Sequence, residues 1–310
     1  MKILVSGGGG FIGSHIVDAL IAENHTVHII DDLSGGFVRN LNPQAVFHKQ
    51  DIRSDEIAGI WKEHRFEILV HCAAQMDVRR SVADPCFDAD INVLGFLNLM
   101  EAGRANGLKK VVFSSTGGAI YGEPEYVPQD ESHPTRPMSP YGITKLTAEH
   151  YLTFYKDTHG IGFVTLRYAN VYGPRQNSHG EAGVVAIFTE RMLADTACYI
   201  NGDGSQTRDY VYVGDVVQAN LKAIAYNGSG VFNVGTGVET RVLDLFMKLR
   251  EITGSTLPQK HAEGKPGEQK RSVVGTGKIE RDLGWKQIDN LETGLVKTVD
   301  WFKTQSVRNG

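Results

Sequence analysis

Short apolar runs rich in β-branched residues alternate with longer segments of helical spacing through the first half of the chain. The apolar runs predict strands at residues 2–6, 25–30, 45–50, 67–73, 109–115 and 163–168. Between them, apolar residues recur three and four apart, as at Ile12, Ile16, Ala19 and Leu20, and at Phe87, Ile91 and Leu94. Strands separated by helices and buried on both faces predict an α/β fold with a doubly wound parallel sheet.

After about residue 170 the pattern loosens. Polar loops at 173–183 and 261–272 flank short strands at 198–201 and 209–213, and two helices are expected at the C-terminal end. A helix from 214 to about 226 and a strand at 231–235 repeat the pattern of the first half. We therefore predict two interleaved domains. Residues 1–170 and 212–237 form the larger one, and residues 171–211 and 238–310 form a smaller α/β substrate-binding domain.

The composition excludes several functional classes. The 310 residues are 41% hydrophobic and 22% charged, with a net charge of −4, which is typical of a globular protein with a sizeable core. No cluster of Lys or Arg indicates a nucleic-acid partner. We expect no signal peptide and no membrane association, because no apolar run approaches the ~20 residues of a membrane span.

The chain has three widely spaced cysteines in apolar contexts, Cys72, Cys86 and Cys198. An odd number of separated cysteines favours buried thiols in a reducing compartment over a disulfide framework or a zinc site. We therefore expect a cytoplasmic location and no metal site.

The segment KILVSGGGGFIGSHIVDAL (residues 2–20) has the pattern of a strand, a glycine-rich turn and a helix. Gly7, Gly10 and Gly13 follow the spacing G-x-x-G-x-x-G. Glycines let the backbone approach a pyrophosphate, and the following helix directs its N–H groups and its positive end at that anion. No Gly-Lys-Ser/Thr follows, so a Walker loop is excluded. This context predicts dinucleotide binding by a Rossmann-like sheet.

Acidic residues follow the second and third predicted strands. Asp31 comes 18 residues after Gly13, where a carboxylate suits the two ribose hydroxyls of NAD and repels the 2′-phosphate of NADP. Asp32 adds to that repulsion. Asp51 and Ile52 could hold adenine, with a carboxylate for its amino group and an apolar wall. These residues predict NAD as the cofactor.

The segment SPYGITK (139–145) places Tyr141 and Lys145 four residues apart, so that they are neighbours on one helical face. Ser139 is a good N-cap and Pro140 suits the first helical position, which places Tyr141 in the first turn. By itself the pair is compatible with an exposed helix surface or with a phenol that transfers a proton beside an ammonium group.

Together these motifs resemble the extended short-chain dehydrogenase/reductase family, and within it the UDP-glucose 4-epimerase branch. The resemblance covers nearly the whole chain. It is carried by SGGGGFIG (6–13), DDLSGG (31–36), HCAAQ (71–75), NVLG (92–95), SSTGGAIYG (114–122), YGITK (141–145), RYANVYGPRQ (167–176), GDGSQTRDYVYV (202–213) and KPGE (265–268).

The resemblance implies NAD-dependent epimerisation of a UDP-hexose at C4 through a transient 4-keto sugar. Tyr141 would be the catalytic base, although a free phenol titrates near ~10. Lys145 and the cationic nicotinamide would favour the phenolate, as would the positive end of the helix. The family often forms homodimers through the helix near 84–106 and the helix that begins at Tyr141, so a homodimer is expected.

The resemblance also assigns binding residues along the chain. The cofactor set is Gly7, Gly10, Phe11, Ile12, Gly13, Asp31, Asp32, Asp51, Ile52, Ala73, Ala74, Gln75, Asn92, Ser114, Tyr141, Lys145 and Tyr168. The UDP-sugar set is Thr116, Tyr141, Asn170, Val184, Tyr199, Asn201, Arg208, Glu268 and Ser272. Arg208 suits a pyrophosphate because guanidinium binds phosphate oxygens bidentately.

Thr116 is the candidate for the third catalytic group, a hydroxyl that hydrogen-bonds the reacting oxygen. It precedes Tyr121 by five residues, whereas many epimerases have a spacing of four, so Ser115 is the alternative. Gly117 and Gly118 follow Thr116 where 4,6-dehydratases carry an acid pair, which argues against dehydration.

Other nucleotide-sugar reactions and a non-catalytic function remain alternatives. A UDP-glucuronate decarboxylase would need a further Arg, which the loops do not show, whereas a UDP-glucuronate 4-epimerase shares the epimerase chemistry. A non-catalytic NAD sensor is disfavoured because Tyr141 and Lys145 are both present. A small residue at Ser272 would leave room for an N-acetyl group on the sugar.

Overall fold

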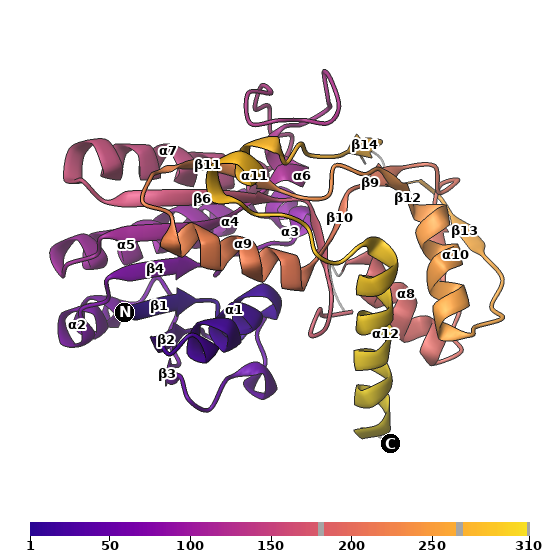
Figure 1. The fold of residues 1–310 in the computed structure, drawn as a ribbon, viewed down its shortest axis with the longest axis horizontal. Helices are drawn as coiled ribbons and strands as arrows, with labels where there is room; N and C mark the ends of the chain where they lie inside the picture. Colours follow the sequence, from indigo (N-terminus) through magenta and orange to yellow (C-terminus); the bar gives the residue numbers. More distant parts are fainter. Residues whose placement is uncertain (179–182, 265–268, 309–310) are drawn as a thin grey trace.

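The computed structural model describes residues 1–178, 183–264 and 269–308. Its centre is a parallel sheet with the strand order β11-β6-β5-β4-β1-β2-β3 (Figure 1). The strands are β1 (Lys2–Ser6), β2 (Thr26–Ile30), β3 (Val46–His48), β4 (Ile68–His71), β5 (Lys110–Thr116), β6 (Gly162–Tyr168) and β11 (Gly230–Val234). The order reverses at β1, between β2 and β4. In doubly wound sheets, ligands bind at this reversal, beyond the carboxyl ends of the strands.

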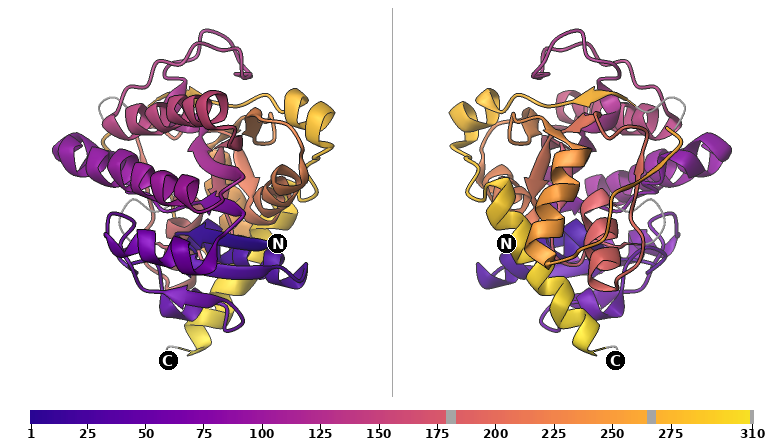
Figure 2. Two further views of the ribbon diagram at one scale, coloured as in Figure 1. Left: turned by 90° about the vertical axis from the view of Figure 1, so that its left-hand side faces the viewer. Right: turned by 90° about the vertical axis from the view of Figure 1, so that its right-hand side faces the viewer.

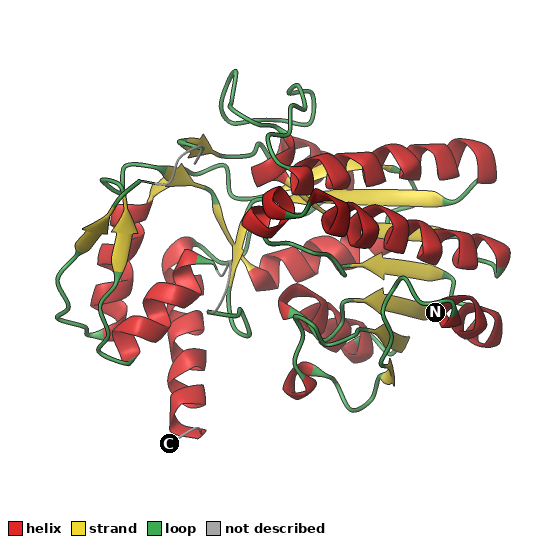
Figure 3. Ribbon diagram, turned by 180° about the vertical axis from the view of Figure 1, so that it is seen from behind, coloured by secondary structure: helices red, strands yellow, loops and turns green. Residues whose placement is uncertain are grey.

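Helices cover both faces of the sheet, as Figures 1 and 3 show from opposite sides. One face packs against α1 (Phe11–Ala22), α9 (Val213–Ala225) and α11 (Gly277–Leu283). The other packs against α2 (Glu56–His64), α5 (Phe96–Ala105) and α7 (Pro140–His159). Because both faces of the strands are buried, the strand sequences are largely apolar. Shorter elements complete this part: η1 (Val38–Asn40), α3 (Val78–Ala83), α4 (Pro85–Ala89), the π-helix η2 (Asp90–Gly95) and α6 (Gly117–Ile120).

A smaller part of the chain has its own apolar core beside the sheet. Its helices are α8 (Val184–Leu193), α10 (Val242–Thr253) and α12 (Leu291–Arg308), which lie together in Figure 2 (right). Its short strands are β7 (Asn170–Tyr172), β8 (Tyr199–Asn201), β9 (Thr207–Arg208), β10 (Tyr210–Tyr212), β12 (Thr240–Arg241), β13 (Lys260–Ala262) and β14 (Arg271–Ser272). They form the small sheets β10-β7, β12-β9-β14 and β13-β8.

The structure confirms the predicted parallel sheet and every strand predicted in the first half, with bounds shifted by at most two residues. The later strand at 231–235 is also confirmed: β11 pairs with β6 at the edge of the large sheet. None of the helices in the described part of the chain combines the length and the apolar character that a membrane span needs.

One expectation about burial, that of a buried Cys86, was wrong, and the apolar residues at helical spacing before β5 do not form one buried stripe. Ile91 packs against the core, but Leu94 is 59% exposed, and the fully buried positions nearby are Asp88 and Asn92. Polar side chains are buried here because they hydrogen-bond one another and the backbone. Cys86 is exposed near the start of α4, so only Cys198 is fully buried and Cys72 is partly so.

Candidate active site

The glycine-rich turn packs directly on the backbone that follows β4. Gly7 has a φ of +74°, and a Cβ there would lie 2.6 Å from the backbone nitrogen of Ala73. Gly10 is the N-cap of α1, so Phe11, Ile12 and Gly13 form the first helical turn. The turn therefore needs glycine at Gly7, and it presents the N-terminus of α1 at the carboxyl edge of the sheet. This is the cradle that a dinucleotide pyrophosphate requires.

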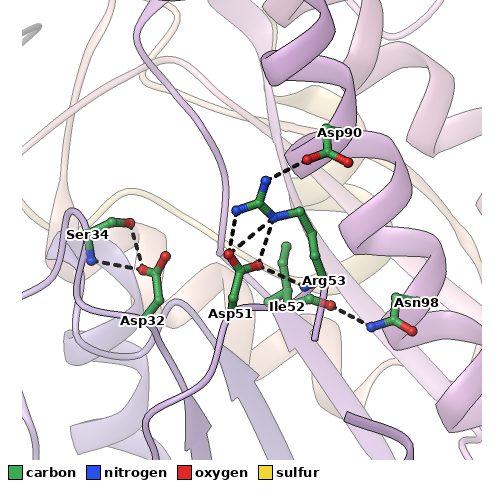
Figure 4. Close-up of polar contacts among 7 residues, drawn as sticks. All are labelled: Asp32, Ser34, Asp51, Ile52, Arg53, Asp90 and Asn98. Carbon is green, nitrogen blue, oxygen red and sulfur yellow. Dashed lines mark hydrogen bonds and ion pairs between the residues drawn. The ribbon is translucent and has the colours of Figure 1, made fainter. Parts of the chain in front are cut away.

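Asp31 is fixed against the same turn. Its carboxylate accepts hydrogen bonds from the backbone N–H groups of Gly9 and Leu33, both at 2.8 Å. Burial raises the pKa of Asp31, and these two hydrogen bonds partly oppose that rise. Asp32 is more exposed and accepts hydrogen bonds from the backbone and hydroxyl of Ser34 (Figure 4). The two carboxylates therefore lie beside the glycine-rich turn, where the sequence predicts the adenosine ribose.

The structure adds an arginine beside Asp51. Arg53 binds the Asp51 carboxylate through its Nε and Nη2 atoms and reaches Asp90 through Nη1 (Figure 4). These hydrogen bonds hold the pKa of Asp51 below its usual range. Ile52 is buried, and its carbonyl accepts a hydrogen bond from Asn98. The acidic group of the predicted adenine site, Asp51, is therefore held in an ion pair with Arg53.

Asn92 holds the segment after β4 in place. Its side chain accepts from the backbone N–H of Gln75 at 2.9 Å and donates to the Gln75 carbonyl at 2.9 Å. Asp88 joins them: its carboxylate accepts from Gln75 and Asn92, and from the hydroxyl of Thr144 at 2.8 Å. This buried network ties the segment that begins with Ala73 and Ala74 to α7.

Tyr141 and Lys145 lie at the N-terminal end of α7. Ser139 caps the helix through a hydrogen bond from Gly142 N, and Pro140 is the first helical residue, as predicted. A Cβ at Gly142 would clash with the carbonyl oxygen of Ala119, so glycine allows α7 to pack closely on α6. This contact brings Tyr141 to the end of β5.

Lys145 is 4% exposed, and its ammonium lies 5.9 Å from the centre of the Tyr141 ring. It donates a hydrogen bond to the carbonyl of Ser114 at 3.0 Å. Burial lowers the pKa of Lys145 to about 8, although Cys72, Asp88 and Glu149 partly oppose that shift. A buried ammonium group beside a phenol favours the phenolate form of that phenol.

The three hydroxyl residues that end β5 point in different directions. Ser114 lies near Cys72 and the hydroxyl of Tyr168, at 3.2 and 3.3 Å. Ser115 donates to the carboxylate of Glu149 at 2.6 Å on the opposite side of the strand. Thr116 is the last strand residue and is partly exposed. Strand alternation thus separates Ser115 from the side that Ser114 and Thr116 share.

The residues between Thr116 and Tyr121 form one turn of helix, α6 (Gly117–Ile120). A Cβ at Gly118 would lie 3.9 Å from the Thr116 hydroxyl and 4.0 Å from the Ser272 hydroxyl. Ser272 is 3% exposed. The structure therefore brings Thr116 and the C-terminal strand β14 to the same glycine.

A buried ion pair supports the end of β5 from the other side. Arg167 binds Glu149 through Nε and Nη2, at 3.1 and 2.6 Å, and its Nη1 donates to the hydroxyl of Tyr121. Tyr121 in turn donates to Asn233 on β11 at 2.7 Å. With Ser115, this network joins β5, β6, β11 and α7 directly behind Thr116.

Several of the predicted UDP-sugar residues are close to one another. Arg208 on β9 lies opposite Ser272 on β14, and Asn170 N donates to the carbonyl of the adjacent Asp209. By contrast, Tyr199 and Asn201 lie on β8 in a different small sheet, and Val184 begins α8. Glu268 lies outside the described residues.

Comparison with protein-family models decides the family. Residues 3–235 match the NAD dependent epimerase/dehydratase family. The chain belongs to this family. It is 43% identical to the UDP-glucose 4-epimerase of Mycolicibacterium smegmatis over 312 residues, which cover 99% of this chain and 100% of the relative.

Members of the family with solved structures have the same fold. The UDP-glucose 4-epimerase of Thermotoga maritima, solved with UDP-glucose, is 48% identical, with a TM-score of 0.97 over 99% of this chain and 100% of the other. The Thermus thermophilus UDP-glucose 4-epimerase, solved with NAD, is 43% identical, with a TM-score of 0.93 over 98% and 99% of the two chains.

For this family member, the sequence did not reveal the residues that position the site. Asp88, Thr144, Glu149 and Arg167 are buried and hydrogen-bond the segments that carry the predicted groups. Asp88, Thr144 and Glu149 occur in helical segments that also carry many polar residues, whereas Arg167 lies in an apolar strand. One signal was available: a charged residue in a predicted central strand, such as Arg167, needs a buried partner of opposite charge.

Proposed function

We propose that the protein is an NAD-dependent UDP-hexose 4-epimerase that interconverts UDP-glucose and UDP-galactose. The observation that carries the proposal is the buried Lys145 beside Tyr141, at a helix N-terminus that also meets the end of β5. The Gly7 cradle and the adjacent Asp31 fit NAD. When bound, NAD would supply a reversible hydride acceptor for C4 of the sugar.

The residues of the chain supply the proton chemistry and the orientation. Tyr141 takes the proton of the C4 hydroxyl as a base and returns it to the product, while the Lys145 cation stabilises its phenolate form. Thr116 orients the reacting oxygen from the end of β5, and Lys145 also bonds the nicotinamide ribose. Arg208 pairs with the pyrophosphate of the UDP group, and Asn170 lies close to it.

The substrate range extends to sugars with an N-acetyl group. Ser272 and Gly118 approach each other next to Thr116, with a Cβ at Gly118 only 4.0 Å from the Ser272 hydroxyl. A bulky residue at either position would fill the space beside Thr116. Two small residues leave that space to the substituent on the sugar ring.

The active form is a homodimer. An apolar surface runs along α7 through Ile143, Tyr151 and Phe154, which are 52%, 36% and 47% exposed. Leu94 extends it onto η2, which packs against α7. Burying such a surface against a second copy would form the four-helix contact expected from the family, and it would account for the exposure of Leu94.

The same proposal includes a cytoplasmic location and the division of the chain into two domains. The described cysteines are unpaired thiols, which suits a reducing compartment. Residues 1–170 and 212–237 would hold NAD. Residues 171–211 and 238–310 would close over the nucleotide sugar.

The test is incubation of purified protein with UDP-glucose, UDP-N-acetylglucosamine and UDP-glucuronate, each without added NAD, with the sugars identified by NMR. The expected result is interconversion of the first two with their C4 epimers and no net NADH. Accumulation of NADH, or of a 4-keto-6-deoxy sugar, would overturn the proposed reaction. Turnover of UDP-glucose alone would overturn only the N-acetyl range.

A further inference from the structure

Three histidines from separate elements meet near the outer edge of the large sheet. They are His28 on β2, His48 at the end of β3 and His64 at the end of α2. Each offers a ring nitrogen, and these three atoms all lie within 4.8 Å of one another. His28 Nδ1 and His48 Nε2 are 3.0 Å apart, and the three ring centres are 4.5 to 5.3 Å apart.

This geometry is close to that of a metal centre. Imidazole nitrogens lie ~2.0–2.1 Å from a tetrahedral zinc ion, which places two such nitrogens ~3.3 Å apart. The His28 Nδ1–His48 Nε2 distance of 3.0 Å is already close to this separation. His28 is buried, and His48 and His64 are partly buried.

The surroundings of His28 and His48 favour the neutral imidazole form of these two side chains. Burial, followed by the two neighbouring rings, lowers the pKa of His28 to about 4, and burial also lowers the pKa of His48. Neutral imidazole is the metal-binding form. Two charged groups adjoin the cluster: Lys2 donates to the His64 carbonyl, whereas Glu63 lies 3.8 Å from His64 Nε2 and favours a cation.

We propose that His28, His48 and His64 bind one divalent transition-metal ion of the Zn²⁺ or Co²⁺ class, with the fourth position left to water. The ion would join β2, β3 and α2. These elements directly precede or flank Asp31 and Asp51, so the role we infer is structural: it fixes the outer strands that carry the predicted adenosine site. This site is separate from the proposed epimerase chemistry.

The test uses untagged protein, Zn²⁺ in calorimetric titrations and Co²⁺ in absorption titrations at pH 7.5. The expected result is binding of one ion per chain with a Kd below ~10 μM, and a Co²⁺ spectrum of nitrogen coordination. His48→Gln and His64→Gln should each weaken binding by at least ~100-fold, since even outer partners of metal ligands are worth 10–100-fold. His150→Ala, at an exposed histidine on α7, should leave binding unchanged.

Two controls keep the outcome unambiguous. Circular dichroism and thermal unfolding in EDTA establish that both glutamine variants are folded, and Cys86→Ser removes the exposed thiol as a competing ligand. The proposal is overturned if the wild-type chain shows no saturable binding below ~1 mM, or if the glutamine variants bind as tightly as the wild type. Epimerase activity is not the readout, so either result leaves the proposed reaction untouched.

Discussion

Replacing Lys145 by methionine should abolish most of the turnover of UDP-glucose while the folded protein keeps or gains stability. The side chain is 4% exposed, and burial lowers its pKa from 10.5 to about 8. At ~1.4 kcal/mol per pKa unit, holding this ammonium in the folded chain costs about 3 kcal/mol near neutral pH. Methionine removes that cost but also the charged hydrogen bond to Ser114, which is worth ~1.5–3 kcal/mol. For the NAD-free protein we therefore expect Lys145→Met to be between equally stable and about 1.5 kcal/mol more stable at pH 7.5.

The pH dependence gives the sharper test. The folded pKa of Lys145 lies below the unfolded one, so the destabilisation is fully present below pH 8 and disappears as the pH rises toward 10.5. Between pH 7.5 and 9.5, wild type should gain ~2 kcal/mol relative to Lys145→Met. Taking the difference between the two proteins cancels the other groups that titrate in this range.

Urea unfolding at the two pH values measures this difference, and turnover of UDP-glucose measures activity. Lys110→Met is the matched control, because burial also lowers the pKa of Lys110 to about 8 and its ammonium donates to the carbonyls of Ile224 and Tyr226. Lys110 begins β5, far from Thr116, so this variant should keep turnover. A stability difference between wild type and Lys145→Met that is independent of pH would refute the reasoning, as would full activity of Lys145→Met.

Three further results are expected. Tyr141→Phe should lower turnover by ~10²–10⁴-fold, the usual contribution of a general base, while NAD stays bound; unchanged turnover would return Tyr141 to an ordinary helix surface. Thr116→Val should reduce kcat while Ser115→Ala, which removes a hydroxyl held by Glu149, keeps most of it; the reverse order would assign the third group to Ser115. Arg167→Met should destabilise the fold by ~3–5 kcal/mol in urea unfolding because it leaves Glu149 charged, buried and unpaired; a loss below ~1 kcal/mol would show that Glu149 is protonated or solvated.

The sequence predicted the sheet well because its signal is local. Each strand is an apolar run bounded by polar residues, and the capped start of α7 at Ser139 and Pro140 follows from residue types alone. The helical spacing of Phe87, Ile91 and Leu94 shows the limit of a local signal. Helical spacing shows which residues share a face, but it does not show whether that face meets the core. Here Asp88 and Asn92 are buried because they take part in a hydrogen-bond network with Gln75 and Thr144. These partners are distant in sequence, so the spacing along the helix does not reveal them.

The histidine cluster and the ion pair behind β5 were beyond sequence reasoning for the same reason. His28, His48 and His64 have no ligand spacing along the chain, and only the pairing of β2 with β3 and the docking of α2 bring them together. Glu149 and Arg167 likewise meet only because α7 packs over β6. In each case the partner is set by topology.

The end of β5 shows how one short run of similar residues acquires different functions. Ser114, Ser115 and Thr116 are chemically alike, so their composition cannot rank them as catalytic groups. Alternation along the strand directs Ser115 to Glu149, where its hydroxyl is already engaged. Ser114 shares the side of Thr116, but its hydroxyl is buried near Tyr168 and its carbonyl anchors Lys145. Thr116 is left at the strand terminus, beside Gly118 and Ser272. The strand thus fixes both the ammonium group and the hydroxyl that the proposed reaction uses, within three consecutive residues.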